Sequence, residues 1–365
     1  MIIILMPARW KMSECWEPSN DLIKISSELP SLTVIVPARN ESKTLPLTLP
    51  SWLNQDYQKT EIIIVNDNSS DNTAECAKAI ASNSNKNVQI INGTEPPSGW
   101  SGKLWALQQG INVSSGEWLL FTDADILHNQ NVWSGLVSKA LSEQHAMVSL
   151  LAFLNTHGIW AGLLIPAFIY FFHFLYPFKK VKYLRSGIAA AAGGCILISR
   201  HTLKRIGGIE AYHDAWIDDL ALAKLIKRAG FSISLSFTKS VISIRQYCKL
   251  SDVWNMVART AFTQLQYSWF TLFGTVVGMS IQFLVPLFGI IVSIINSFPV
   301  IGVLSFLAFI FMSITYTPTL FFYDLSIYRV LALPLAGFLY IAMTLTSAVN
   351  YFEGKRDWRG TRKNN

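Results

Sequence analysis

The chain has 365 residues, of which 51% are hydrophobic and 15% are charged. Soluble domains carry about 25% charged residues, so the composition excludes a disordered chain and an ordinary soluble enzyme. The net charge of +7 includes no long basic run, which argues against a nucleic-acid partner. The four cysteines show no CxxC spacing and no Cys/His cluster, which argues against a disulfide framework and a zinc site and favours a reducing, cytoplasm-facing domain.

Apolar residues are concentrated in the last third of the chain. Between residues 271 and 328 the only charged residue is Asp324, and such a stretch is too long and too apolar for the core of a soluble domain. The sequence therefore predicts one α/β domain joined to a membrane region. The predicted divisions are an N-terminal stub at 1–30, the α/β domain at 31–265, membrane helices at 266–350 and a basic cytoplasmic tail at 351–365. The apolar run at 1–6 is too short for a membrane span, so the start of the chain is interpreted as either a stub or a truncated anchor.

Short β-branched runs alternate with helical segments in the α/β domain. The predicted strands are 32–36, 61–65, 88–91, 117–121, 147–153, 195–198 and 233–235. The predicted helices are 72–82, capped by Asp71, and 103–113 and 220–229. A further helix is expected after the first strand, with Pro46 in its first turn and shortened or kinked by Pro50. This alternation predicts an α/β nucleotide-binding layout, in which ligands bind beyond the carboxyl ends of the strands.

An apolar segment at 159–178 interrupts the α/β domain. As a helix its 20 residues extend about 30 Å, the thickness of a bilayer core. It lies between Asp125 and Asp219, and if these carboxylates share one site an odd number of crossings between them is impossible. We therefore interpret 159–185 as a surface-lying or re-entrant element anchored by the basic residues that follow it. A buried core helix is the alternative. Lipid contact is favoured by phenylalanines on more than one helical face, namely Phe168, Phe171, Phe172, Phe174 and Phe178.

Beyond residue 269 the lengths allow three spans, at 270–295, 298–322 and 330–350. Three crossings put the C terminus on the side opposite the α/β domain. The residues from 355 to 363 are rich in Lys and Arg, and the positive-inside rule places such a tail in the cytoplasm. The sequence leaves this conflict open, because either one segment does not cross or the charge rule fails.

Carboxylates stand at three candidate positions. Asp123 and Asp125 follow a strand, where a DxD pair can hold a divalent cation together with substrate phosphates; a solvated turn is the alternative. Asp67 ends the second strand, where it can accept hydrogen bonds from a nucleobase or stabilise a turn. Asp218 and Asp219 precede a helix. Asp219 is interpreted as a general base whose pKa a neighbouring carboxylate raises, with N-capping as the alternative.

Basic and glycine residues complete the candidate site. Lys103 opens a helix, from which it can reach a diphosphate, but the surrounding stretch is neither a Walker loop nor a GxGxxG fingerprint. Arg259 lies on an amphipathic helix, where it can screen a pyrophosphate or snorkel to lipid headgroups. Gly193 and Gly194 precede a strand, where they allow a close approach of acceptor or sugar or make a turn.

Together these motifs resemble the family 2 glycosyltransferases of the GT-A fold. The similarity is closest to the hopene- or hopanoid-biosynthesis-associated membrane glycosyltransferases, and it spans residues 32–362. Related enzymes glycosylate ceramide and carotenoid acids. The matching stretches are PARNE (37–41), GWSGKLWALQQG (99–110), TDADI (122–126), LLIPAFIYFFHFLYPF (163–178), AAAAGGC (189–195), IDDLALA (217–223) and VARTAFTQL (257–265).

The resemblance implies a metal-dependent, inverting transfer of one sugar from a UDP-sugar to a membrane lipid of the hopanoid, carotenoid or glycolipid kind, with Mg2+ or Mn2+ as the metal. It also implies a multi-pass protein of the cell (inner) membrane whose catalytic domain faces the cytoplasm and contacts an anionic membrane surface. The implied nucleotide-binding residues are Pro37, Arg39, Glu41, Asp67, Lys103, Asp123 and Arg259. The implied metal-binding residues are Asp125 and Asp123, and the implied catalytic residues are Asp219 and Asp218.

One departure from the family pattern limits this resemblance. Processive synthases and ceramide-type enzymes carry Q/RxxRW, whereas this chain reads MVART at 256–260. This argues against a chain-extending synthase and gives Arg259 partial support. Two alternatives stay open: a polyprenyl-phosphate glycosyltransferase, and a non-catalytic lipid-binding scaffold. A transporter is disfavoured, because the apolar spans contain almost no ionisable residue to line a pathway.

Overall fold

The computed structural model describes residues 5–18, 29–355, 357–358 and 361–362. The chain divides into two compact units. The sheet unit comprises Ser13–Leu154 and Phe178–Arg245, and the helical unit comprises Met1–Met12, Asn155–Pro177 and Gln246–Asn365. Because the units interleave along the chain, the domain boundaries drawn from the sequence stay a prediction. The predicted stub and the basic tail lie partly outside the described residues.

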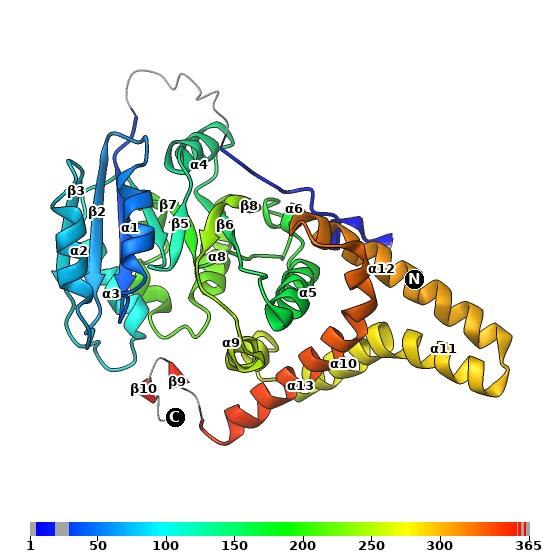
Figure 1. Ribbon diagram of the computed structural model, residues 1–365. Helices are drawn as coiled ribbons and strands as arrows, with labels where there is room; N and C mark the ends of the chain where they lie inside the picture. The colour runs from blue at the N-terminus through cyan, green and yellow to red at the C-terminus, as the bar shows by residue number, and fades with distance from the viewer. Residues whose placement is uncertain (1–4, 19–28, 356, 359–360, 363–365) are drawn as a thin grey trace. The chain divides into compact units, whose positions relative to one another are not determined.

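The sheet unit is built on one eight-stranded mixed sheet (Figure 1), in the order β3-β2-β1-β4-β7-β6-β8-β5. Strands β1 to β4 run parallel, β7 runs antiparallel to β4 and β6, β6 and β8 run parallel, and β5 runs antiparallel to β8. This confirms the predicted α/β class. The strands are β1 Leu32–Ala38, β2 Thr60–Asn66, β3 Asn87–Asn92, β4 Trp118–Thr122, β5 Ile126–His128, β6 Met147–Phe153, β7 Cys195–Ser199 and β8 Ile233–Ser243.

Helices cover both faces of this sheet. The alternation of side chains along β1 turns Val34 and Val36 into a core shared with α1, α2 and α4. Ile35 points to the opposite face, where α3 packs so closely that a Cβ at Gly110 would lie 2.5 Å from the Ile35 Cγ2 atom. The helices are α1 Leu45–Leu53, α2 Thr73–Ala81, α3 Gly102–Val113, α4 Val132–Ser142, α6 Phe178–Val181, α7 Arg200–Arg205 and α8 Asp218–Arg228, with the 3-10 turn η3 at Ile209–Tyr212.

Local sequence signals agree with most of these elements. Helix α1 has Pro46 in its first turn and Pro50 inside, and it is only nine residues long. The predicted cap of α2 needs a correction: Asn72 occupies the N-cap position, although the Asp71 carboxylate still accepts a hydrogen bond from the Thr73 N–H at 3.1 Å. Strand β8 is much longer than the three residues predicted. Its serines and threonines are buried in the structure, but as polar residues they gave no sign of burial in the sequence.

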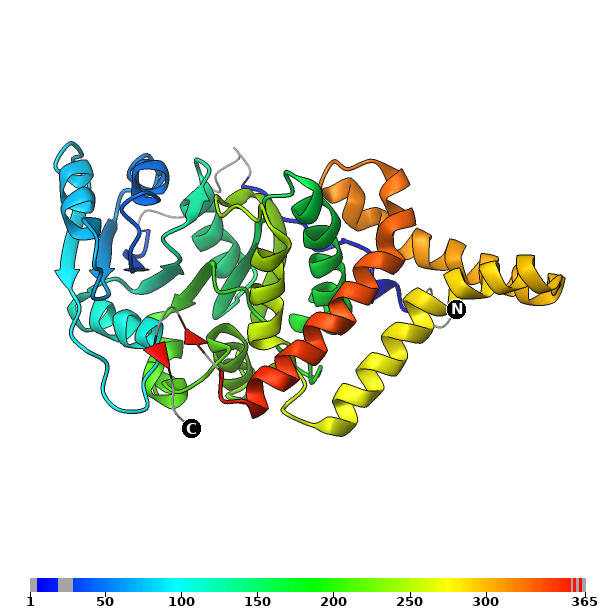
Figure 2. The same ribbon diagram turned by 60° about the horizontal axis from the view of Figure 1, so that its bottom comes forward.

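The helical unit contains the apolar helices. Helices α5, α9 and α13 pack together, whereas α11 and α12 form a hairpin (Figure 2). Within the described residues four segments are long and apolar enough to cross a membrane: Ile159–Val181, Trp269–Asn296, Pro299–Phe322 and Ile327–Phe352. The elements are α5 Ile159–Leu175, α9 Leu250–Gln264, α10 Trp269–Met279, the π-helical turn η4 Ser280–Leu284, α11 Val285–Asn296, α12 Pro299–Phe322, the 3-10 turn η5 Ile327–Ala332 and α13 Leu333–Phe352, followed by the two-residue strands β9 Asp357–Trp358 and β10 Thr361–Arg362.

One phenylalanine of the apolar insert departs from the expected lipid contact. Phe178 belongs to the sheet unit, where it is buried and its ring stacks on Phe237 with the centroids 4.1 Å apart. This side chain therefore anchors the end of the insert to β8 and is not available to lipid.

Candidate active site

The candidate residues of the sheet unit gather at one edge of the sheet. Parallel strands β1, β2 and β4 end there, and antiparallel β7 begins there, because Thr122 at the end of β4 pairs with Cys195 at the start of β7. This topology brings Asp67, Asp123 and Gly193 to the same edge although they are far apart in the sequence. Beyond the carboxyl ends of strands is where α/β sheets bind ligands.

Lys103 joins carboxylates from two distant segments. Its Nζ atom lies 2.8 Å from Oδ1 of Asp123 and 3.4 Å from Oδ2 of Asp218. The lysine is held by the first turn of α3, whose N-cap residue Ser101 accepts a hydrogen bond from the Leu104 N–H at 3.3 Å. The structure thus brings Asp123 of the predicted DxD motif together with Asp218 of the predicted base motif. We call Lys103, Asp123, Asp218 and Asp219 the lysine cluster.

Both oxygens of the Asp219 carboxylate are oriented by backbone N–H groups. Gly193 donates to Oδ2 at 2.8 Å, and Leu220 donates to Oδ1 at 2.7 Å. A Cβ at Gly193 would lie 3.3 Å from Nζ of Lys103 and 3.4 Å from Asp219 Oδ2, so the glycine provides the room this contact needs. The N-capping alternative is wrong, because α8 begins at Asp218 and its N-cap residue is Ile217.

The electrostatics of the lysine cluster suit proton transfer. Burial and the neighbouring Asp218 carboxylate raise the pKa of Asp219 to about 7, against the opposing effects of Lys103 and the two backbone N–H groups. Burial alone would lower the pKa of Lys103, but Asp123, Asp218 and Asp219 outweigh it and raise that pKa. Asp219 is therefore poised to exchange a proton near neutral pH, beside an ammonium group that stays charged.

The lysine cluster lines a pocket in the sheet unit. Tyr212 is a pocket residue that the sequence did not reveal, because nothing in the local pattern of η3 marks it. It is buried, and burial followed by the Asp218 charge raises the pKa of its hydroxyl well above the usual value. The pocket is lined by Pro37, Lys103, Leu104, Leu107, Phe121, Thr122, Asp123, Gly193, Ile196, Tyr212, Asp218, Asp219 and Leu222.

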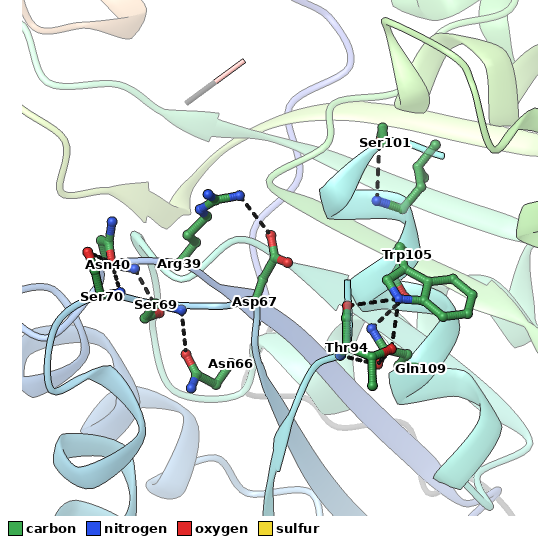
Figure 3. Close-up of polar contacts among 11 residues, drawn as sticks. Arg39, Asn40, Asn66, Asp67, Ser69, Ser70, Thr94, Ser101, Trp105 and Gln109 are labelled. Atoms are coloured by element: carbon green, nitrogen blue, oxygen red, sulfur yellow. Dashed lines mark hydrogen bonds and ion pairs between the residues drawn. The ribbon is translucent and has the colours of Figure 1, made fainter. Parts of the chain in front are cut away.

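A second polar group lies at the ends of β1 and β2. The Arg39 Nη1 atom lies 4.0 Å from Asp67 Oδ2, and left-handed Asn40 links this loop to the one after β2 (Figure 3) by accepting from the Ser70 N–H at 2.8 Å. Glu41 is buried, and its N–H donates to Thr73 Oγ1 at 2.8 Å. We call Arg39, Asn40, Glu41 and Asp67 the arginine cluster.

The two clusters approach each other at the start of α3. A Cβ at Gly102 would lie 3.2 Å from Oδ2 of Asp67, and the next residue is Lys103. Carboxylates are favourable at helix N termini, which explains why buried Asp67 is tolerated there. The candidate nucleotide-binding and catalytic residues of the sheet unit therefore form neighbouring groups.

Aromatic rings fix the loop that leads into α3. Trp100 packs against Trp105 and His213, with ring centroids 5.2 Å away in both cases. The indole N–H of Trp105 donates to the Thr94 carbonyl at 3.0 Å, as Figure 3 shows. The Ser101 N–H donates to the His213 carbonyl at 3.0 Å. These contacts connect the loop before Lys103 to the segment that leads to Asp218.

The structure does not bring Asp125 into the lysine cluster, and Arg259 belongs to the other unit. The Asp125 carboxylate accepts a hydrogen bond from the Ser243 hydroxyl at 3.4 Å, at the end of β8, and among the described residues it is not one that lines the pocket. Arg259 lies on α9 of the helical unit, and its role stays a prediction. The described residues contain no group of three or more His, Cys, Asp or Glu side chains arranged to hold a metal. Asp123 and Asp125 still offer carboxylate oxygens, which suit a hard divalent cation that takes its other ligands from a diphosphate and water.

Comparison with known proteins agrees with this picture. The sequence model of the family described as glycosyl transferase family 2 matches residues 33–207. The chain is 34% identical over 118 residues to 4,4'-diaponeurosporenoate glycosyltransferase of Staphylococcus haemolyticus (strain JCSC1435), a match that covers 32% of this chain and 30% of that protein. It is 28% identical over 235 residues to the probable glycosyltransferase YdaM of Bacillus subtilis (strain 168), covering 62% of this chain and 53% of that protein.

A solved structure shares the fold over nearly the whole length. The mannosyltransferase PcManGT from Pyrobaculum calidifontis, in complex with GDP-Man and Mn2+, aligns with a TM-score of 0.58 and 17% identity, covering 96% of this chain and 94% of that one. This likeness supports the GT-A-like mixed sheet followed by apolar C-terminal helices. The chain spans between about a third and a half of the two curated relatives named above.

Proposed function

We propose that the protein transfers one sugar from a UDP-sugar to a membrane lipid, with inversion at the anomeric carbon. The match of residues 33–207 to the model of glycosyl transferase family 2 supports this proposal. The acceptor hydroxyl oxygen forms a bond to the anomeric carbon as the bond between that carbon and the diphosphate oxygen breaks. Asp219 takes the hydroxyl proton, and UDP leaves with the electron pair. A single displacement of this kind inverts the configuration.

One observation carries the proposal: Lys103 contacts both Asp123 and Asp218, beside the oriented carboxylate of Asp219. In a single in-line displacement the base lies across the anomeric carbon from the leaving diphosphate, and both groups carry negative charge. Lys103 places a fixed positive charge between these two functions. The raised pKa of Asp219 suits a base that works near neutral pH.

The arginine cluster is assigned to the nucleotide. Arg39 and the buried Asp67 offer one donor and one acceptor at the ends of neighbouring strands. Glu41 links the same loop to α2 through its N–H, and Pro37 lines the pocket. Asp123 and Asp125 are assigned to Mg2+ or Mn2+, since both offer carboxylate oxygens. When bound, the metal supplies positive charge that stabilises the leaving diphosphate. The shared fold of PcManGT, which is in complex with GDP-Man and Mn2+, supports a nucleotide-sugar donor and a metal.

The acceptor is assigned to the lipids of the cytoplasmic face of the cell membrane. Four apolar helices long enough to cross a bilayer support a protein that works at a membrane. The name of the Staphylococcus relative refers to a carotenoid acid, which is compatible with a hopanoid, carotenoid or glycolipid-like acceptor. Basic residues after the apolar insert, Lys179, Lys180, Lys182 and Arg185, suit an anionic surface.

The test is the release of UDP by purified protein with membrane lipid extracts, comparing Asp219→Asn with the unaltered chain. We expect Asp219→Asn to lower turnover on a neutral hydroxyl acceptor by about 10²–10⁴-fold, the usual contribution of a general base. Asp214→Asn is the matched control, because Asp214 is exposed on the same segment. Normal turnover of Asp219→Asn would remove the proposed base. UDP- and GDP-sugars are assayed in parallel to identify the donor.

The same experiment separates the alternatives. A polyprenyl-phosphate acceptor is already an anion and scarcely needs a base, so Asp219→Asn would largely retain activity with that acceptor. A non-catalytic lipid-binding scaffold would release no UDP with any extract, and chelation of divalent metal would change nothing.

A further inference from the structure

Helix α1 packs against residues 123–129, which carry the DxD motif and strand β5 and are called here the DxD segment. The apolar side chains of α1 are buried in the same core as Ala124 and Ile126. Polar groups are buried beside them: Thr48 has no exposed surface, and Gln55, just beyond the helix, is 3% exposed. Burying a polar side chain costs free energy unless it is hydrogen-bonded. The partners of these groups therefore show what α1 does besides filling the core.

Four side chains of α1 and of the turn that follows it hydrogen-bond to main-chain groups of the DxD segment. The contacts are Thr48 Oγ1 to the Ala124 carbonyl at 2.8 Å, Trp52 Nε1 to the Ile126 carbonyl at 2.9 Å, the His128 N–H to Ser51 Oγ at 3.2 Å, and Gln55 Nε2 to the Asn129 carbonyl at 2.8 Å. These residues recur at intervals of three and four, so they share one side of the helix. We call Thr48, Ser51, Trp52 and Gln55 the α1 polar face.

The α1 polar face supplies partners that a neighbouring strand would otherwise supply. Strand β5 lies at one end of the sheet, beside β8, where the Ile244 N–H donates to the Asp125 carbonyl at 2.9 Å. In an antiparallel pair, only alternate residues exchange hydrogen bonds with the partner strand. The carbonyls of Ala124 and Ile126 therefore point away from β8, as the exposed edge of a strand does. Helix α1 satisfies both of them.

The start of α1 is fixed by the arginine cluster. The Glu41 carbonyl accepts hydrogen bonds from the Thr44 N–H at 3.0 Å and the Leu45 N–H at 2.9 Å. The N–H of Glu41 is itself bound to Thr73 of α2. This nine-residue helix therefore connects the residues assigned to the nucleotide with the segment assigned to the metal.

A second chain of hydrogen bonds holds the DxD segment from its other side. The Trp133 indole N–H donates to His128 Nδ1 at 3.2 Å, which leaves Nε2 as the protonated nitrogen of the ring. Nε2 donates to the Thr122 hydroxyl at 2.9 Å, and this hydroxyl donates to the Gly194 carbonyl at 2.9 Å. Gly194 follows the glycine whose N–H orients the proposed base. With this second support, the loss of one α1 contact should displace the DxD segment rather than unfold it.

We propose that the α1 polar face consists of positioning residues for the metal site. It holds the main chain between Asp123 and Asp125 and thereby fixes how their two carboxylates are oriented. Thr48 is its central member, because the carbonyl that it binds belongs to Ala124, which lies between the two aspartates. The inference rests on the proposed function in one respect, the assignment of Mg2+ or Mn2+ to this pair.

The test is the binding of Mn2+ to the purified full chain with saturating UDP, followed by the electron paramagnetic resonance signal of free Mn2+. Thr48→Val keeps the shape of the side chain but removes the hydroxyl, so the Ala124 carbonyl loses its donor. We expect the affinity for Mn2+ to fall by about 10–100-fold, the usual effect of removing a group that orients a metal ligand. Thr48→Ser restores the hydroxyl and should bind Mn2+ as the unaltered chain does.

Thr202→Val is the matched control. Thr202 is also buried, and its hydroxyl accepts a hydrogen bond from Ser199 Oγ at 2.7 Å. Ser199 pairs with Trp118 at the start of β4, so this site lies at the sheet edge opposite to the DxD motif. Both Thr→Val variants lose a buried hydrogen bond and should unfold at a lower temperature. Only Thr48→Val should bind Mn2+ more weakly.

Each outcome has a definite meaning. Unchanged Mn2+ affinity in Thr48→Val, an equal loss in Thr202→Val, or a loss that Thr48→Ser does not restore would overturn the inference and leave the proposed reaction standing. If Thr48→Val fails to fold, Trp52→Phe removes the donor to the Ile126 carbonyl but keeps an aromatic ring, and weaker Mn2+ binding is expected again. Weaker binding by Thr48→Val without sugar transfer by the unaltered chain would support the inference and count against the proposed function. If the unaltered chain binds no Mn2+ with UDP, the metal assignment and the inference both fail.

Discussion

The lysine cluster and the arginine cluster lie at the same sheet edge but use charge differently. Lys103 contacts two carboxylates at 2.8 and 3.4 Å and interacts with a third. Arg39 makes one looser pair, with 4.0 Å between its Nη1 atom and Asp67 Oδ2. The lysine cluster also orients its base through two backbone N–H groups, whereas the arginine cluster ties together two loops.

This difference suggests a division of labour. Three carboxylates around one ammonium group shift one another's pKa values, because charges in a partly buried site are weakly screened and interact strongly. A single pair at a longer distance contributes little to stability, about 0.2–1 kcal/mol when exposed. We therefore expect substitutions in the lysine cluster to change turnover, and substitutions in the arginine cluster to change donor binding.

Lys103→Met is expected to have the largest effect. The substitution leaves Asp123 and Asp218 without their shared counter-ion and raises the pKa of Asp219 further, so the base is protonated at neutral pH. We expect turnover to fall by about 10²–10³-fold, the usual cost of losing one preorganised electrostatic group. Steady-state kinetics with saturating donor measure it, with exposed Lys204→Met as the control. A rise in KM with unchanged kcat would instead assign Lys103 to donor binding.

Asp125→Ala tests whether the metal belongs to the lysine cluster. Asp125 accepts from Ser243 and does not line the pocket, yet it is the proposed metal ligand. We expect a loss of about 10²-fold in turnover and a higher metal concentration for half-maximal activity, measured by titration with Mn2+. Near-normal activity with the metal chelated would remove the assignment of the DxD motif.

Asp218→Asn changes the pH dependence. The pKa of Asp219 is about 7, so kcat/KM for a neutral acceptor should fall as pH drops below about 7. Since the Asp218 charge is one cause of that high pKa, Asp218→Asn should move the acidic limb of the profile to lower pH. The raised pKa also means that the free energy of unfolding decreases as pH rises from the unfolded value near 4 through about 7. An unshifted limb would show that the base is another group.

Arg39→Ala is expected to have the smallest effect. The pair with Asp67 is long and the arginine side chain is 28% exposed, so its loss should raise the KM for the donor by less than about tenfold and leave kcat nearly unchanged. Initial rates over a range of donor concentrations measure both constants. A large fall in kcat would show that the two clusters act as one unit.

The sequence predicts the central strands well, because β1, β2 and β4 are continuous apolar runs that end in polar residues. It misses the length of β8, since alternating Ser and Thr look exposed, whereas Ser234, Ser236 and Thr238 are buried. It also misses α4 and the short β5, which follow the Asp125 turn without a clear periodic signal. The local sequence pattern reveals which side chains of a segment are buried only when those side chains are apolar.

The sequence predicts which residues belong to the site, but it does not predict which of them contact each other. The DxD and Asp-Asp motifs stand out in the sequence, yet nothing there pairs Lys103 with Asp218. Gly193 is noticeable as a point of close approach, but the sequence does not reveal that its N–H orients Asp219. Such contacts depend on strand order, and antiparallel β7 brings Gly193 to this edge.

The apolar helices show the same limit. Ile159–Val181 and Pro299–Phe322 are similarly long and apolar, so length and composition do not distinguish them. Their burial distinguishes them, because half of the most apolar window of Ile159–Val181 is buried, against 17% of that window in Pro299–Phe322. The sequence does not report which apolar helices are covered by other helices.

The partnership of α5 with α13 also has a consequence for biosynthesis. The ribosome makes α5 long before α13, so the apolar face of α5 emerges before the helix that packs on it. At roughly 5–20 residues per second, about 8–30 s pass between the end of α5 and the arrival of α13. During that interval the nascent chain carries an exposed apolar helix. This exposure favours binding of the growing polypeptide to a bilayer before the α11–α12 hairpin has been translated.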